Sequence, residues 1–290
     1  MERGFKLKMA KQLGEKIAID NGFTELPVDP FVIAERHGIV VQAKPDTAVG
    51  VSGMLMRSGD TFGILYATHI ESEGFQRFSV AHELGHYFLE GHPEHVLKED
   101  VHESRAGFAT CDPFELEADH FAAGLLMPKK AFTREIGRNC DGLDGLKALA
   151  DCCKTSLTST AIRYADLTDC AAAIVVSTGQ TVDYCFMSEA LKSVAGLTWI
   201  KKGTPLPSSC ETRRFNASLE NIRSSLNAED ETNLTDWFGG RCSIEGLEEV
   251  VGLGVYGKTL TVLTFSAMLD EEEEESEEDL KRSWTPQFHR

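Results

Sequence analysis

The sequence predicts an α+β protein with a larger N-terminal part, a smaller and mostly β C-terminal part, and an acidic tail. Helical segments and an antiparallel strand pair share the first 168 residues, whereas strand hairpins dominate from Cys170 onward. Nine acidic residues lie between Asp270 and Asp279, where like charges and low apolar content oppose folding. We therefore expect a core at residues 1–130, a helical segment at 131–168, a mixed α/β domain at 169–268 and a disordered tail at 269–290.

Local signals predict the elements of the N-terminal part. Pro30 suits the first turn of a helix, and Gly38 is suited to end it. Ser58, Gly59 and Asp60 form a turn signal between two apolar runs, which predicts an antiparallel pair. The predicted elements are helices over 8–21 and 30–37, a short strand over 39–41, strands over 51–56 and 61–67, and helices over 73–90 and 114–126.

Residues 146–167 resemble a helix-turn-helix, with two short helices around a turn at 154–156. DNA contact needs a basic face, but only Lys147, Lys154 and Arg163 are basic in this segment. Packing of two amphipathic helices is therefore the favoured interpretation.

Two turn signals organise the C-terminal part. Gly179 and Gly257 each lie at the centre of a polar turn between two apolar runs. The predicted elements are strands over 171–177 and 181–187, a helix over 217–227, and strands over 250–255 and 259–265.

The composition argues against several classes of protein. No run of eighteen apolar residues occurs, so we expect no membrane-spanning helix, and the N-terminus lacks the apolar core of a signal peptide. Eight irregularly spaced cysteines without a Cys-x-x-Cys favour reduced thiols and a cytoplasmic location over a disulfide framework. The net charge is −17 and would still be −8 without the nine residues of the acidic block, so we expect no direct nucleic-acid partner. The oligomeric state stays open.

The most informative segment is Phe78-Ser79-Val80-Ala81-His82-Glu83-Leu84-Gly85-His86-Tyr87-Phe88. It contains His-Glu-x-x-His, in which His82 and His86 lie one helical turn apart and can reach one metal ion. Glu83 is offset by one residue and can take a proton from water at the open side of that ion. The motif predicts a catalytic metal centre with two histidine ligands and Glu83 as the base.

A catalytic centre of this type needs a third protein ligand. Glu115 and Asp119 lie one turn apart on the helix over 114–126, as in the Glu-x-x-x-Asp arrangement of gluzincins. In that arrangement the glutamate binds the ion, and the aspartate orients a ligand histidine. Glu117 lies about 160–200° around the helix from Glu115, so only one of the two can face the ion.

His92 is the competing third ligand, because it follows His86 at the metzincin spacing of six residues. Metzincins have a glycine where Leu89 stands, so we expect the helix to continue to about Glu90 and to carry His92 away. We therefore favour Glu115, and we interpret His92, His95 and His102 as solvated side chains of a polar loop over 92–113.

Residues 77–86 and 115–128 together resemble the ImmA/IrrE metallo-endopeptidases, the second segment through its ending Phe-Ala-Ala-Gly-Leu-Leu-Met-Pro. The resemblance extends over about residues 8–168. It implies a zincin-like fold and one zinc ion per chain, bound by His82, His86 and Glu115. It also implies Glu83 as the base and a protein substrate, a helix-turn-helix repressor of stress or mobile-element genes. Manganese or iron could occupy the same ligands.

The expected function is zinc-dependent, site-specific endopeptidase activity that releases transcription. Two alternatives stay open, a regulatory protein that captures the repressor without cutting it and a broad-range peptidase or toxin. The intact Glu83 favours an enzyme, because a structural zinc site needs no base.

Two finer expectations concern the substrate. The strand over 61–67 is expected to be an edge strand that pairs with an extended peptide. The group that stabilises the oxyanion is left open among Tyr87, His92, His95 and His102.

Overall fold

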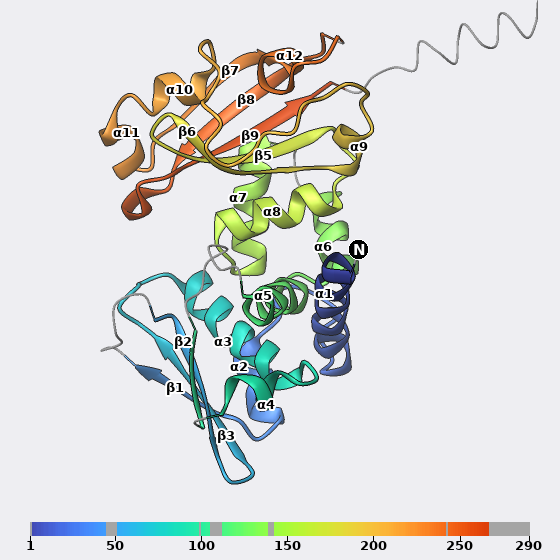
Figure 1. Cartoon of the computed structure of the whole chain (residues 1–290), viewed down its shortest axis with the longest axis vertical. Coiled ribbons are helices and arrows are strands. Elements are labelled where there is room, and N and C mark those ends of the chain that lie inside the picture. Colours follow the sequence, from blue (N-terminus) through green and yellow to red (C-terminus); the bar gives the residue numbers. More distant parts are fainter. Residues whose placement is uncertain are drawn as a thin grey trace, which may run out of the picture. The chain divides into compact units, whose positions relative to one another are not determined.

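The computed structural model describes residues 2–44, 51–98, 100–104, 112–138, 142–241 and 243–266. They form two compact units divided between Thr168 and Asp169, and each unit combines helices with one β-sheet (Figure 1). The chain is therefore a mixed α+β protein, as the sequence predicts. The acidic block and the rest of the predicted tail lie outside the described residues. In the part that the structure describes, no helix combines the length and the apolar content needed to cross a bilayer.

The first unit holds eight helices and four strands within its described residues. These are α1 (Glu2–Asp20), α2 (Pro30–Arg36), β1 (Val40–Lys44), β2 (Gly53–Ser58), β3 (Thr61–Ala67), α3 (Glu73–Phe88), α4 (His92–Val96), β4 (Val101–Ser104), α5 (Pro113–Leu126), α6 (Lys129–Ile136), α7 (Gly142–Cys153) and α8 (Leu157–Leu167).

The sheet of the first unit has the strand order β1-β3-β2-β4. The predicted antiparallel pair is confirmed as β2 and β3, with Met54 opposite Leu65. The expectation that this second strand lies at an edge is wrong, because β1 pairs with it in parallel, with Val41 opposite Ile64. Parallel pairing leaves no local turn signal in the sequence. Among the described strands, the edges are β1 and β4.

Helix α5 packs against both α1 and α3, and α3 in turn packs on β2 and β3. Phe121 is fully buried on α5, and its ring stacks on Phe88 of α3 at 5.9 Å between centroids. This packing holds α3 and α5 side by side, so that residues one turn apart on each helix can converge.

The helix α3 ends at Phe88, earlier than expected, and the described residues of the polar loop predicted to follow it include a helix and a strand. Leu89 is extended, and Gly91 adopts a left-handed conformation with φ of +79°. The chain reverses there into α4, and β4 then pairs antiparallel to β2. Glycine makes this reversal possible two residues after the position that the metzincin pattern requires.

The helices α7 and α8 pack on one another around the predicted turn. Arg163 is buried and binds Glu15 and Asp166, while Lys154 pairs with Glu73. Lys147 pairs with a neighbouring acid on its own helix. The three basic side chains thus pair with acids of the same unit, which favours the packing interpretation over DNA contact.

The second unit contains a five-stranded antiparallel sheet in the order β6-β5-β9-β8-β7. Both predicted hairpins are present, whereas the helix predicted over 217–227 is reduced to five residues because Asn227 begins a strand. Trp237, Phe238 and Phe265 belong to its apolar core. Its elements are β5 (Ala172–Thr178), β6 (Thr181–Met187), α9 (Glu189–Lys192), α10 (Glu211–Phe215), α11 (Leu219–Arg223), β7 (Asn227–Asn233), α12 (Leu234–Phe238), β8 (Glu245–Gly252), η1 (Gly254–Tyr256) and β9 (Thr259–Phe265).

Candidate metal centre

Helix α3 carries three of the predicted site residues in its buried part. His82 is 1% exposed, and Glu83 and His86 are fully buried. Apolar neighbours such as Val80 and Leu84 bury the helix around them. Polar groups buried in this way are costly unless they find partners, so their contacts are informative.

Helix α5 supplies the partners, and Gly85 lets it come close. A Cβ atom at Gly85 would lie 3.1 Å from the Cα atom of Ala118 on α5. This approach brings Glu115 and Asp119 against the two histidines. The glycine between the two histidine ligands is therefore explained by helix packing.

His82, His86 and Glu115 form a group in which one ligand atom from each lies within 4.8 Å of the others. The Nε2 atoms of the two histidines are 3.1 Å apart. Glu115 places Oε2 3.4 Å from Nε2 of His82 and Oε1 3.2 Å from Nε2 of His86. Three donor atoms thus point at one place.

Each member of this group has a further polar partner. His82 Nδ1 lies 2.8 Å from Asp119 Oδ1, and His86 Nδ1 lies 3.2 Å from His92 Nδ1. Glu115 Oε1 lies 2.9 Å from Nε2 of His102, which β4 carries. The Nδ1 contacts leave both Nε2 atoms directed at the group's centre.

The Glu83 carboxylate is buried against β2. Neither of its oxygens makes a hydrogen bond of normal geometry among the described residues, although the nearby Ser104 hydroxyl favours the charged form. A Cβ atom at Gly53 would lie only 2.5 Å from Oε1 of Glu83, so glycine leaves room for the carboxylate. Burial raises the pKa of Glu83 to about 7, although the charge of His82 opposes this shift. A carboxyl group with such a pKa can accept a proton near neutral pH.

The pKa values of the group differ because burial and contacts act in opposite directions. Burial lowers the pKa of His82, but the hydrogen bonds to Asp119 and Glu115 outweigh it and raise the pKa to about 10. Burial dominates at His86 and lowers its pKa to about 3. Burial raises the pKa of Glu115, but hydrogen bonds from His102, His82 and His86 hold it well below its usual range.

The donor set fits a divalent metal ion. Two imidazole nitrogens and one carboxylate oxygen are the ligand types that zinc takes in catalytic sites. The buried oxygens of Glu83, which make no hydrogen bond of normal geometry within the described part of the chain, provide a polar group that such a centre would use. A metal ion would replace the proton that His82 carries in its absence.

Two of the three histidines of the predicted polar loop, His92 and His102, lie inward rather than in solvent. His92 is 1% exposed and contacts His86, so the interpretation as a solvated side chain is wrong for it. His102 also lies inward, against Glu115, whereas His95 is exposed and stacks on Phe114. Tyr87 packs edge-on against Phe62.

Two contacts escaped the sequence analysis. Glu117 is not a member of the ligand group, but at 3.3 Å it contacts His92, which in turn contacts His86. The only sequence signal near this contact was the six-residue spacing from His86 to His92. The turn at Gly91 determines whether that spacing brings His92 back onto His86. The contact between Gly53 and Glu83 has no sequence signal of its own.

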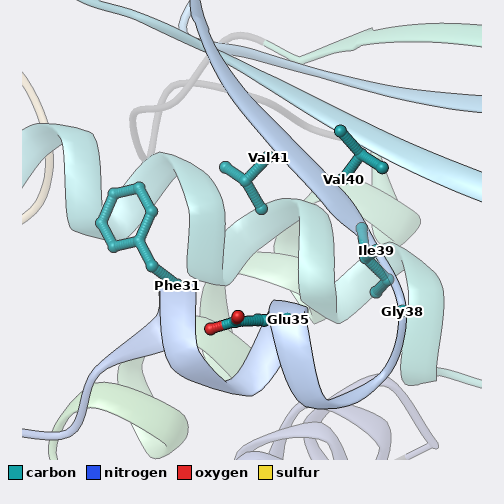
Figure 2. A pocket seen from close by; sticks show the side chains of 6 residues that line it. All are labelled: Phe31, Glu35, Gly38, Ile39, Val40 and Val41. Atoms are coloured by element: carbon teal, nitrogen blue, oxygen red, sulfur yellow. The ribbon is translucent and has the colours of Figure 1, made fainter.

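A separate hollow of about 490 Å³ lies between α2 and β1 (Figure 2). Its lining is apolar apart from the Glu35 carboxylate and contains none of the predicted site residues. The lining residues are Phe31, Glu35, Gly38, Ile39, Val40 and Val41.

Comparisons with known proteins indicate a family for part of the chain and a similar fold. Residues 34–150 match the sequence profile of a peptidase family described as the IrrE N-terminal-like domain. No curated protein sequence matches the chain. The solved structure of a Mycobacterium tuberculosis transcriptional regulator is similar in fold, with a TM-score of 0.57 and 13% identity over 88% of this chain and 76% of that one.

Proposed function

Because the chain belongs to the ImmA/IrrE peptidase family through the domain at residues 34–150, we propose that it is a zinc-dependent endopeptidase with a zincin-like core. The observation that carries this proposal is the convergence of His82, His86 and Glu115 beside Glu83. A structural metal site needs neither an open position nor a base. The buried carboxylate of Glu83, which makes no hydrogen bond of normal geometry among the described residues, therefore favours catalysis over a structural role.

Each residue of the centre has a separate role in the proposed hydrolysis. His82, His86 and Glu115 would hold the ion, which when bound would polarise the water and the scissile carbonyl. Glu83 takes the proton of the attacking water and later passes it to the leaving amine. Asp119 holds His82 with Nε2 free for the ion.

His102 is the best candidate for the oxyanion-stabilising group. Its side chain is 21% exposed beside Glu115, so substrate can reach it. His92 lies buried against His86, and His95 stacks on Phe114. We expect a His102→Phe variant to lose kcat, because the donor to the developing oxyanion is gone.

The substrate is proposed to pair with β4, since β3 lies inside the sheet. Arg57 N donates to Asp100 O across β2 and β4. Antiparallel alternation then places the N–H groups of Val101 and Glu103 on the open side of the strand. Proline is tolerated at such positions.

A Glu103→Pro variant tests this pairing. It removes one outward N–H group, and Glu103→Ala is the matched control that keeps it. We expect the proline variant to raise KM for a protein substrate while zinc stays bound. Equal KM in the two variants would exclude strand pairing at β4.

The finer proposal is that the substrate is a helix-turn-helix repressor of stress or mobile-element genes, cut at a specific site in the cytoplasm. The family resemblance supports it. The similar fold of a protein described as a transcriptional regulator is compatible with it, but at 13% identity it is evidence of fold alone.

Labelling of new protein N-termini in cell extract tests this function, with a Glu83→Gln variant as control. New termini in one or a few repressors, formed by the parent but not by the variant, would support specific cleavage. Cleavage of many proteins and of casein would indicate a broad-range peptidase. A Glu83→Gln variant that still releases transcription in cells would instead indicate a non-proteolytic anti-repressor.

A further inference from the structure

His92 and Glu117 form a chain of polar contacts behind the proposed metal ligand His86, buried at His92 and partly exposed at Glu117. His92 Nδ1 lies 3.2 Å from His86 Nδ1, and His92 Nε2 lies 3.3 Å from Glu117 Oε2. The three residues come from α4, α3 and α5, so the chain joins three helices. His92 is 1% exposed, and Phe114 covers it with an edge-on ring contact at 4.9 Å between centroids.

The direction of the hydrogen bonds follows from the ring that would bind the ion. His86 directs Nε2 at His82 and Glu115, so Nε2 must keep its lone pair for the metal. The proton of the neutral ring then sits on Nδ1 and is donated to Nδ1 of His92. His92 must therefore carry its own proton on Nε2, where the Glu117 carboxylate accepts it.

The opposite tautomer of His92 is unfavourable at both ends. The Nδ1–H groups of His86 and His92 would then face one another at 3.2 Å. The Nε2 lone pair of His92 would face the Glu117 carboxylate at 3.3 Å. Neither N–H group of the buried pair would then have an acceptor along this chain, and leaving buried donors unsatisfied is destabilising. Glu117 therefore selects the tautomer of His92, and His92 selects that of His86.

We propose that His92 is a positioning residue for metal ligand His86 and that Glu117 holds His92 in the tautomer this requires. The inference rests on the proposed metal centre, and it adds a role for two residues outside the ligand set. It corresponds to the role of Asp119 at His82, reached through one additional imidazole.

Zinc affinity of the full-length chain, measured by competition with a chelator, tests the proposal. A His92→Leu variant fills the space without an acceptor, and we expect its zinc dissociation constant to rise about 10–100-fold. His92→Asn is the matched variant, because asparagine branches at Cγ as leucine does but keeps an acceptor near the Nδ1 position, so it should retain most of the affinity. His95→Leu is the control on the same helix, because that ring contacts Phe114 rather than a ligand.

The visible absorption of the Co2+-substituted protein is the second readout. We expect His92→Leu to change this spectrum, since the orientation of His86 changes, and His95→Leu to leave it unchanged. Should His92→Leu not fold, Glu117→Leu replaces it, because Glu117 is 18% exposed and changes the core less. Its zinc dissociation constant should rise in the same direction.

Equal zinc affinity and spectra in the leucine and asparagine variants of His92 would overturn the inference. A parent chain that binds no metal would overturn the metal centre, and this inference with it. A parent that binds zinc but cuts no protein would contradict only the proposed function, since these readouts do not depend on cleavage.

Discussion

A Gly53→Ala substitution should disable the base while leaving the metal ligands in place. The added Cβ atom would lie 2.5 Å from Oε1 of Glu83, whereas ordinary van der Waals contact begins at 3.4 Å. The carboxylate must therefore move by about 0.9 Å. Because the atom that must move is the far end of a flexible side chain, we expect little change in the free energy of unfolding.

A misplacement of ~1 Å in a catalytic group costs on the order of 10²-fold in rate. This corresponds to about 2.7 kcal/mol of transition-state stabilisation. We therefore expect kcat for cleavage to fall about 100-fold, with zinc content and thermal unfolding close to those of the parent.

The matched control is Gly63→Ala on β3, where an added Cβ atom would meet its nearest neighbours at an ordinary 3.6 Å. Cleavage rate, zinc content and unfolding temperature are measured for both variants. Unchanged kcat in Gly53→Ala would refute the placement of Glu83 as the base. Loss of zinc together with activity would show that the change disturbs the whole centre rather than the carboxylate.

The remaining predictions concern metal affinity and stability. Asp119→Ala should raise the zinc dissociation constant ~10–100-fold, because His82 loses the acceptor that fixes its tautomer; unchanged affinity would contradict that role. Gly85→Ala should weaken zinc binding less, since Ala118 has to yield only a few tenths of an ångström; affinity equal to that of the parent would mean that this close approach is unnecessary. Burial raises the pKa of the Asp166 carboxyl, but the hydrogen bond from a lysine outweighs burial and holds this pKa below its ordinary value of 3.8. The stabilisation that ionised Asp166 contributes is therefore present above pH 3.8 and is lost as the pH falls through the lowered pKa. In urea unfolding of the metal-free protein, Asp166→Asn should lower the free energy of unfolding by about 1 kcal/mol or less at pH 7, and by a smaller amount near pH 3. An equal decrease at both pH values would show that the decrease does not come from the charge of Asp166.

Much of the candidate site could be predicted because its signals are local. His82, Glu83 and His86 share one helix, and the spacing of Glu115 and Asp119 repeats on a second helix. A helical period alone therefore fixes which residues share a face within each helix. Bringing the two faces together depends on helix packing, which the motif reveals only through Gly85.

Contacts between segments far apart in the sequence, above all strand pairing, could not be predicted. The parallel partner of β3 has no turn signal, so the sequence could not reveal that β1 covers that edge. The strand beginning at Asn227 is polar apart from Ala228, and its pairing with β8 overrides the weak β propensity of its residues. Likewise His92 depends on a single glycine conformation at Gly91, which brings the ring back onto His86.

The most direct test of the central claim is the metal content of the purified chain, measured by plasma mass spectrometry beside His82→Ala and Glu115→Ala. We predict about one zinc ion per parent chain and a loss or strong weakening of zinc binding in both variants. A well-folded parent that takes up no metal even after zinc is added would contradict the account. Zinc retained at full affinity by Glu115→Ala would contradict the ligand set.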